Sequence, residues 1–348
     1  MSSQQGHAAR TYKYDLVRAV AIIFVVAVHS MVFLDSSYRG GDYLRLAMQT
    51  LFFTGNALFF LLSGRFNLKR RSDDGQFKLY YFKKIRSILV PFVIIVFIRT
   101  CYDNPFALGG WELIKTFAKN LLFNYSNREY WFIYTLTGYL VVAPFLANIF
   151  AALTRKQKQA FLAIGLLYQA VQTLLANMGY QFAWGYLFNG FALVFTVGYF
   201  LEEIVPSKRF TLVRIDAIGV VCLACTAILM HLGYTAGMQD TSPLYTVLAI
   251  AIYLSLLKIG EHAKPNVVIS FIAKHSFSVY LVHMMVLIPL QSIQALYFDG
   301  PISMLSFVIM TTIVLTGSLA VSFLLDSLVF GPVQRAFDAL WKRLNKAR

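Results

Sequence analysis

Long apolar stretches alternate with short polar segments along the chain. Five stretches hold no Asp, Glu, Lys or Arg: 46–64, 130–153, 160–201, 276–298 and 300–325. A helix needs about 20 apolar residues to cross a hydrocarbon core roughly 30 Å thick. The stretch 160–201 is about twice that length, so we expect two helices in it, joined by the polar residues 177–181.

The lengths of these stretches indicate helices and not the strands of a barrel. Barrel strands would be short and would alternate apolar and polar residues, whereas the runs here are long and uniformly apolar. We therefore predict an all-α fold, a polytopic bundle of about ten transmembrane helices forming one domain over residues 1–348. The expected spans are 16–34, 45–65, 87–102, 130–150, 160–176, 186–201, 215–232, 244–257, 275–290 and 303–325.

Composition and charge support this class and set an orientation. Hydrophobic residues make up 58% of the chain and charged residues only 14%, against about a quarter in soluble domains. The net charge of +15 could indicate nucleic-acid binding, so the positions of the charges decide. With the N-terminus inside, all but six of the 31 Lys and Arg lie in cytoplasmic segments or helix ends, as the positive-inside rule requires. We expect both termini in the cytoplasm, contact with anionic lipids and no nucleic-acid partner.

Three segments outside the spans have their own patterns. The loop 66–86 is basic and is expected to lie along the membrane. The outer segment 103–129 carries apolar residues at helical spacing, which predicts an amphipathic helix at the membrane interface. The tail 326–348 is expected to form a short basic helix.

Charged and titratable side chains within the spans are few. They are the first candidates for chemistry, because such groups in a membrane need protein or water around them. The set is Arg18 and His29 in the first span, Arg99 in the third, His231 near the end of the seventh and His283 in the ninth. Their spacing provides no histidine and carboxylate ligand set, so we expect no metal. The predicted spans also lack a central carboxylate, which counts against an ion-coupled transporter.

Arg18 and His29 are eleven residues apart, about 1100° of helical rotation against 1080° for three turns. They therefore share one face of the first span, roughly 16.5 Å apart along its axis. Arginine can hold a phosphate and neutral histidine can accept a proton from a hydroxyl, so the pair would suit a long anionic donor. The alternative is that Arg18 is an interfacial anchor and His29 a polar residue at the membrane edge. For His283, with Tyr280 on the same side, the alternative is a helix–helix hydrogen bond.

Five segments in order resemble the membrane acyltransferase-3 family. They are Arg18 with His29 ten intervening residues later, Phe59-Phe-Leu-Leu-Ser-Gly64, Lys84-Ile-Arg-Ser-Ile-Leu-Val-Pro91, Tyr130-Trp-Phe-Ile-Tyr134 with Pro144, and His275-Ser-Phe-Ser-Val-Tyr-Leu-Val-His283. The extent of the chain is most similar to short polysaccharide O-acetyltransferases of bacterial inner membranes, such as the type that modifies enterobacterial common antigen. One departure is Glu129, at a position where related short members often have a histidine.

The resemblance implies a multi-pass enzyme of the bacterial inner membrane that moves an acyl group, most simply acetyl, from cytoplasmic acyl-CoA to a hydroxyl of an extracytoplasmic glycan. Acetyl-CoA would be a co-substrate, with no permanently bound cofactor, and the acceptor a cell-envelope glycan or lipid-linked sugar. An oligomer is left open. A transporter or flippase for a glycan or acyl carrier, without covalent chemistry, is the alternative.

The same resemblance implies roles for individual residues. His29 would be the general base, while Arg18 and Arg86 would lie near the nucleotide of the donor. Tyr280, His283 and Ser63 are candidate donors to the oxyanion. The aromatic side chains of Trp131 and Tyr134 would stack on a sugar or form an interfacial belt. Glu129, in place of a histidine, indicates a different acceptor.

Overall fold

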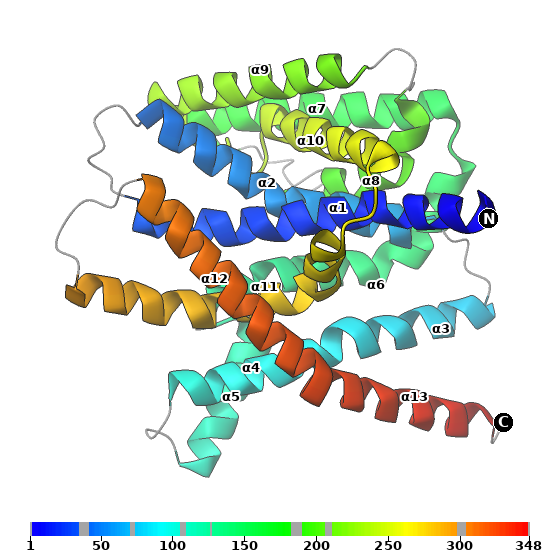
Figure 1. Cartoon of the computed structure of the whole chain (residues 1–348). Helices are drawn as coiled ribbons and strands as arrows, with labels where there is room; N and C mark the ends of the chain where they lie inside the picture. Colours follow the sequence, from blue (N-terminus) through cyan, green and yellow to red (C-terminus); the bar gives the residue numbers. More distant parts are fainter. Residues whose placement is uncertain are drawn as a thin grey trace. The chain divides into compact units, whose positions relative to one another are not determined.

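Helix is the regular structure throughout the part of the chain that the structure describes. This computed structural model describes residues 2–34, 42–69, 74–104, 109–125, 127–181, 190–205, 211–297 and 304–346 (Figure 1). No strand occurs within these ranges, so the all-α prediction is confirmed. The α-helices are α1 (Ser2–Ser30), α2 (Asp42–Asn67), α3 (Asp74–Lys84), α4 (Val90–Asp103), α5 (Gly110–Phe123), α6 (Trp131–Ala152), α7 (Arg155–Asn177), α8 (Ala192–Ile204), α9 (Leu212–His231), α10 (Pro243–His262), α11 (Val267–Tyr297), α12 (Met304–Leu325) and α13 (Gly331–Lys346). Short 3-10 segments are η1 (Met31–Phe33) and η3 (Arg128–Tyr130), and π-helical segments are η2 (Ile85–Leu89) and η4 (Asp326–Phe330).

Nine helical runs among the described residues are long and apolar enough to cross a membrane. They correspond to nine of the ten predicted spans. The tenth, 186–201, is represented by α8, whose 13 residues give a length of only about 20 Å. Its first predicted residues, 186–189, lie outside the described residues, as does Ser303 at the start of the last predicted span. The orientation with both termini inside stays a prediction.

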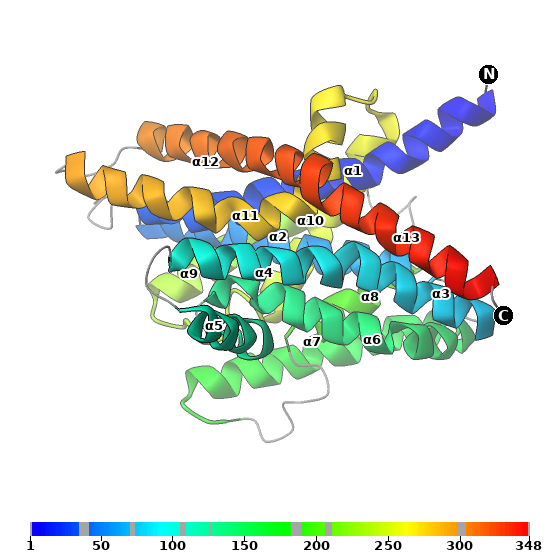
Figure 2. The same cartoon turned by 90° about the horizontal axis from the view of Figure 1, so that it is seen from below.

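The segments between the spans are more helical than expected. The amphipathic helix predicted in 103–129 is α5, and the helix predicted in the tail is α13. The basic loop 66–86 differs from its prediction, because α3 continues through η2 into α4 as one helical run (Figure 2). No proline interrupts the sequence between residues 76 and 90, so the third span begins well before residue 87.

Contacts divide the chain into two compact units. Unit 1 comprises Met1–Arg71, Val142–Ser276 and Gly300–Thr311, and unit 2 comprises Ser72–Val141, Phe277–Asp299 and Thr312–Arg348. Residues of α6, α11 and α12 are divided between the units, so the division follows no linker in the sequence. The expectation of a single domain stays a prediction.

In unit 1, α1 packs against α2 and α10, and α2 packs against α8 and α9. Two glycines allow the backbones of α2 and α8 to touch. A Cβ atom at Gly64 would lie 1.7 Å from the Phe195 carbonyl oxygen, and one at Gly198 would lie 2.1 Å from the Leu61 carbonyl oxygen. Small residues at helix crossings provide this close approach in membrane proteins.

In unit 2, two π-helical segments each precede a proline. Pro91 follows η2 and Pro332 follows η4 at the same offset of two residues. A proline removes a backbone donor and collides with the preceding turn, and a π-helical turn widens the helix at that point. Near these turns α13 contacts α3 through the Phe82 and Trp341 rings, which stack with centroids 4.2 Å apart.

Candidate active site

In unit 1, Arg18 and His29 lie on the same continuous helix, α1. Ile22 and Val25 lie on the same face between them, and both are fully buried. The stripe therefore faces protein and not lipid along its central turns. The side chains of Arg18 and His29 at its two ends are half-buried.

Arg18 is held at the end of α2. Its Nη1 donates to the Asp15 carboxylate at 2.9 Å, and its guanidinium carbon lies 5.2 Å from the centre of the Phe66 ring. The side chain remains about a third exposed (34%). The guanidinium is thus positioned by a carboxylate and an aromatic ring while part of it stays accessible to an anion.

Helix packing explains the glycine of the segment Phe59-Phe-Leu-Leu-Ser-Gly64. Its glycine is the point at which α2 touches α8. Ser63, one position earlier, is half-buried on α2. The structure thus gives a physical reason for the glycine, while the oxyanion role of Ser63 stays a prediction.

A group of charged residues near Arg18 was missed by the sequence analysis. The Glu202 carboxylate accepts hydrogen bonds from Arg65 Nε at 2.5 Å, the Tyr14 hydroxyl at 3.0 Å and Lys13 Nζ at 3.3 Å. Lys13 also donates to Glu261 at 2.8 Å. Burial would raise the pKa of the Glu202 carboxyl, but the charges of Arg65 and Lys13 hold it below its ordinary value. We call these five residues the Glu202 cluster. Its signal in the sequence was a carboxylate directly following the apolar stretch 160–201.

In unit 2, His283 is fully buried on α11. Its Nδ1 lies 2.7 Å from the backbone carbonyl oxygen of Tyr280. A carbonyl only accepts, so Nδ1 carries the hydrogen and the lone pair of the neutral ring is on Nε2. This bond fixes the tautomer and the orientation of the ring.

Two tyrosines join α11 to η3. The Tyr280 hydroxyl donates to the Glu129 carbonyl, and the Tyr130 hydroxyl donates to the Leu281 carbonyl at 2.9 Å. Glu129 and Tyr130 therefore contact Tyr280 and Leu281 within unit 2. The hydroxyl hydrogen of Tyr280 is engaged in this bond, which favours a positioning role over donation to an oxyanion.

The other predicted residues of unit 2 lie in different surroundings. Arg86, on the π-helical segment η2, forms an ion pair with Asp338 of α13. The Tyr134 hydroxyl donates to the carbonyls of Asn120 and Leu121 at the end of α5, so this side chain anchors that helix. Trp131, at the start of α6, is 37% exposed, and its ring contacts that of Phe132.

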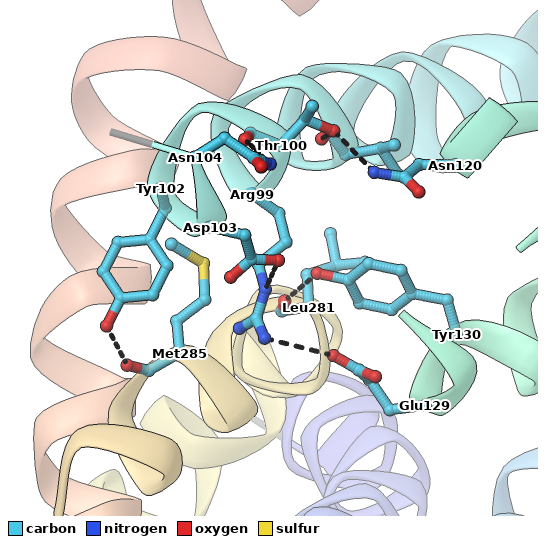
Figure 3. Close-up of polar contacts among 11 residues, drawn as sticks. Arg99, Thr100, Tyr102, Asp103, Asn104, Asn120, Glu129, Tyr130, Leu281 and Met285 are labelled. Atoms are coloured by element: carbon cyan, nitrogen blue, oxygen red, sulfur yellow. Dashed lines mark hydrogen bonds and ion pairs between the residues drawn. The ribbon is translucent and has the colours of Figure 1, made fainter. Parts of the chain in front are cut away.

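Glu129 is buried beside Arg99, which the sequence analysis had singled out without assigning a role. Arg99 Nε donates to Asp103 at 2.9 Å, and Arg99 Nη2 lies 4.0 Å from Glu129 Oε1 (Figure 3). Adjacent to them, Asn120 donates to the Thr100 hydroxyl at 3.0 Å. Unit 2 therefore contains a buried polar centre as well as the predicted His283.

Comparison with known proteins decides the family. The model of a family described as an acyltransferase domain matches residues 11–326, nearly the whole chain. The chain belongs to acyltransferase family 3. The match covers all five segments that carried the resemblance, from Arg18 to His283. No curated protein and no solved structure matches the chain.

This membership establishes an acyltransferase, and with nine apolar helical runs in the described residues it makes the protein a multi-pass membrane enzyme. It does not favour the alternative of a transporter or flippase. Four of the candidate residues lie on two different helices. The helix α1 bears Arg18 and His29, and α11 bears Tyr280 and His283.

Proposed function

We propose that this acyltransferase moves an acetyl group from cytoplasmic acetyl-CoA to a hydroxyl of an extracytoplasmic glycan or lipid-linked sugar, in the bacterial inner membrane. His29 removes the proton of the acceptor hydroxyl, and the alkoxide oxygen attacks the thioester carbonyl carbon. The tetrahedral intermediate then expels the CoA thiolate, which takes the proton from the His29 imidazolium. The products are an O-acetyl ester and free CoA.

One observation carries this proposal beyond the family. The buried face of α1 bears a guanidinium at one end and an imidazole about 16.5 Å farther along. The phosphates and the thioester of an acyl-CoA are likewise separated by a long pantetheine arm. Arg18 therefore matches the anionic end of the donor and His29 the reactive end. Of the two aromatic residues predicted to stack on a sugar, Trp131 is the one at 37% exposure, and the Tyr134 hydroxyl is bonded to α5.

Of the three residues predicted to donate a hydrogen bond to the oxyanion, we propose that one of two does so. Tyr280 already donates its hydroxyl hydrogen to a backbone carbonyl. His283 and Ser63 remain, and protonated His283 Nε2 would donate. Arg86, which is ion-paired with Asp338, would contact a donor phosphate only in exchange for that carboxylate.

The test of the base is His29→Ala in membranes supplied with labelled acetyl-CoA. We expect transfer of label to glycan to fall by a factor on the order of 10²–10⁴ because the proton acceptor is lost. The matched control is His262→Ala, which removes an exposed histidine at the end of α10. Undiminished transfer by correctly folded His29→Ala protein would rule out His29 as the base.

The test of the donor site is Arg18→Ala. We expect the KM for acetyl-CoA to rise by about tenfold or more, because a charge-assisted contact to phosphate is lost. Arg343→Ala, which removes an exposed arginine on α13, is the control. An unchanged KM would remove Arg18 from the donor site. Mass spectrometry of envelope glycans with and without the enzyme would identify acyl group and acceptor together.

A further inference from the structure

Unit 2 contains a group of three charged side chains that the proposed reaction does not use, and two of them, Arg99 and Glu129, are largely buried. The three are Arg99 and Asp103 on α4 and Glu129 on η3, shown in Figure 3. The side chain of Arg99 is 5% exposed and that of Glu129 is 10% exposed. Charged groups removed from water to this extent require hydrogen-bond partners.

The hydrogen bonding of this group is incomplete. Arg99 Nε donates to Asp103 at 2.9 Å, but the 4.0 Å between Arg99 Nη2 and Glu129 Oε1 is too long for a hydrogen bond. Within the described residues, Arg99 Nη1 and Glu129 Oε1 are buried and have no hydrogen-bond partner. A donor and an acceptor are therefore both unsatisfied, and the acceptor lies 4.0 Å from the other terminal nitrogen of the same guanidinium.

The surrounding side chains hold this arrangement in place. The Glu129 carbonyl accepts from Tyr280, and the next residue, Tyr130, donates to the Leu281 carbonyl. On α4, the Tyr102 hydroxyl donates to the Met285 carbonyl at 3.4 Å (Figure 3). These bonds fix the backbone of Glu129 and the end of α4 on either side of the gap.

The chemistry of the gap selects its ligand. One oxygen atom at about 2.8 Å from each group could accept from Arg99 and donate to Glu129. A hydroxyl, of a ligand or of water, does both, whereas a phosphate or carboxylate cannot donate to Glu129 and an ammonium cannot accept from Arg99. The formal charges of the three residues sum to −1, which also disfavours an anion. A ligand that displaces water from this gap would therefore be a neutral molecule that bears hydroxyl groups.

We propose that Arg99 and Glu129 bind a hydroxyl of a neutral sugar, and that this pair forms the acceptor site of the enzyme. Asp103 is a positioning residue that orients the guanidinium. The role of this pair as the acceptor site rests on the proposed acyl transfer, but sugar binding can be tested independently of that reaction.

The binding test uses purified protein and neutral methyl hexosides of the gluco, galacto and manno series. Methyl glucuronoside is the anionic probe and methyl glucosaminide the cationic probe. We expect at least one neutral hexoside to raise the Tm of the wild type by about 2 °C, and neither charged probe to do so. The shift should vanish in Glu129→Gln and persist in Glu112→Gln, which changes an exposed ion pair on α5. Stabilisation by the glucuronoside alone, by the glucosaminide alone, or by none of the probes, would overturn the assignment.

The kinetic test separates this assignment from the proposed reaction. In Glu129→Gln and Arg99→Lys we expect the acceptor KM to rise about tenfold to a hundredfold, with an unchanged KM for acetyl-CoA. Arg128→Lys, at an exposed neighbour, is the control for Arg99→Lys. An unchanged acceptor KM with a lowered Tm would show a structural ion cluster only. Hexoside binding without any acetyl-CoA turnover would instead refute the reaction and leave the sugar site standing.

Discussion

The two units each contain a partly buried group of charged residues, and the two groups differ in how completely they are paired. In the Glu202 cluster of unit 1, Arg65 and Lys13 both lie within 3.3 Å of Glu202, and the Tyr14 hydroxyl donates to the same carboxylate. In unit 2, Arg99 lies 4.0 Å from Glu129, and each has a buried atom that makes no hydrogen bond to the described residues.

This difference separates two uses of buried charge. A fully bonded cluster recovers the free energy lost on removal from water, and it joins the helices that contribute to it. An incompletely bonded group leaves part of that free energy unrecovered and available to a ligand. We therefore expect substitutions in the Glu202 cluster to act mainly on stability and substitutions of Arg99 and Glu129 mainly on binding.

The largest expected effect comes from the helix contact that supports the Glu202 cluster. In Gly64→Ala the new Cβ would lie 1.7 Å from the Phe195 carbonyl oxygen, so α2 and α8 must move apart. We expect a loss of about 3 kcal/mol or more in unfolding free energy, measured as a lower Tm and a smaller monodisperse fraction.

The control for this change lies in unit 2. A Cβ at Gly138, on an exposed position of α6, would meet no atom of the described residues within 4 Å. Gly138→Ala is expected to be neutral or to stabilise by about 0.5–1 kcal/mol, because alanine favours helix. Equal losses in both variants would show that the α2–α8 contact has no special importance.

The next largest effect tests the comparison itself. Glu202→Gln removes the charge that pairs with Arg65 and Lys13, and we expect a loss of about 1–3 kcal/mol in unfolding free energy, since the carboxylate is only 26% exposed. Glu129→Gln is expected to change the unfolding free energy by less than about 0.5 kcal/mol, because Glu129 Oε1 accepts no hydrogen bond. Chemical unfolding of the two variants side by side measures the contrast. A larger loss in Glu129→Gln would reverse our interpretation.

The sequence was sufficient to predict the helices but not the contacts between them. Nine predicted spans were found because charge-free runs of membrane length require helix whatever their neighbours. The extension of the third span through Asp74–Lys84 was missed, because basic residues suggested a surface loop although nothing in that segment breaks a helix. The shortness of α8 was missed as well, since burial by other helices and burial by lipid give the same apolar pattern.

The candidate site shows the same limit. Helical periodicity was enough to place Arg18 and His29 on one face of α1. It could not show that the Tyr280 hydroxyl is engaged by Glu129, because that bond joins residues 151 positions apart. The sequence marks Arg99 as an intramembrane cation, but its partners Asp103 and Glu129 lie at the two ends of the outer segment 103–129, so the pattern did not bring them together.

The smallest expected effect is the response of the Glu202 cluster to acid. Neighbouring positive charges hold the pKa of Glu202 below its ordinary value of 4.5 in the folded protein. A lowered folded pKa stabilises the protein above the unfolded pKa, and this stabilisation is lost as pH falls through the folded value. The Tm of the wild type should therefore fall more steeply than that of Glu202→Gln between pH 5 and lower values, and the difference between them should narrow. Glu129→Gln should follow the wild type, because the Glu202 cluster is intact in it. A constant difference in Tm between wild type and Glu202→Gln across this range would show that Glu202 stabilises the protein by packing and not by its charge.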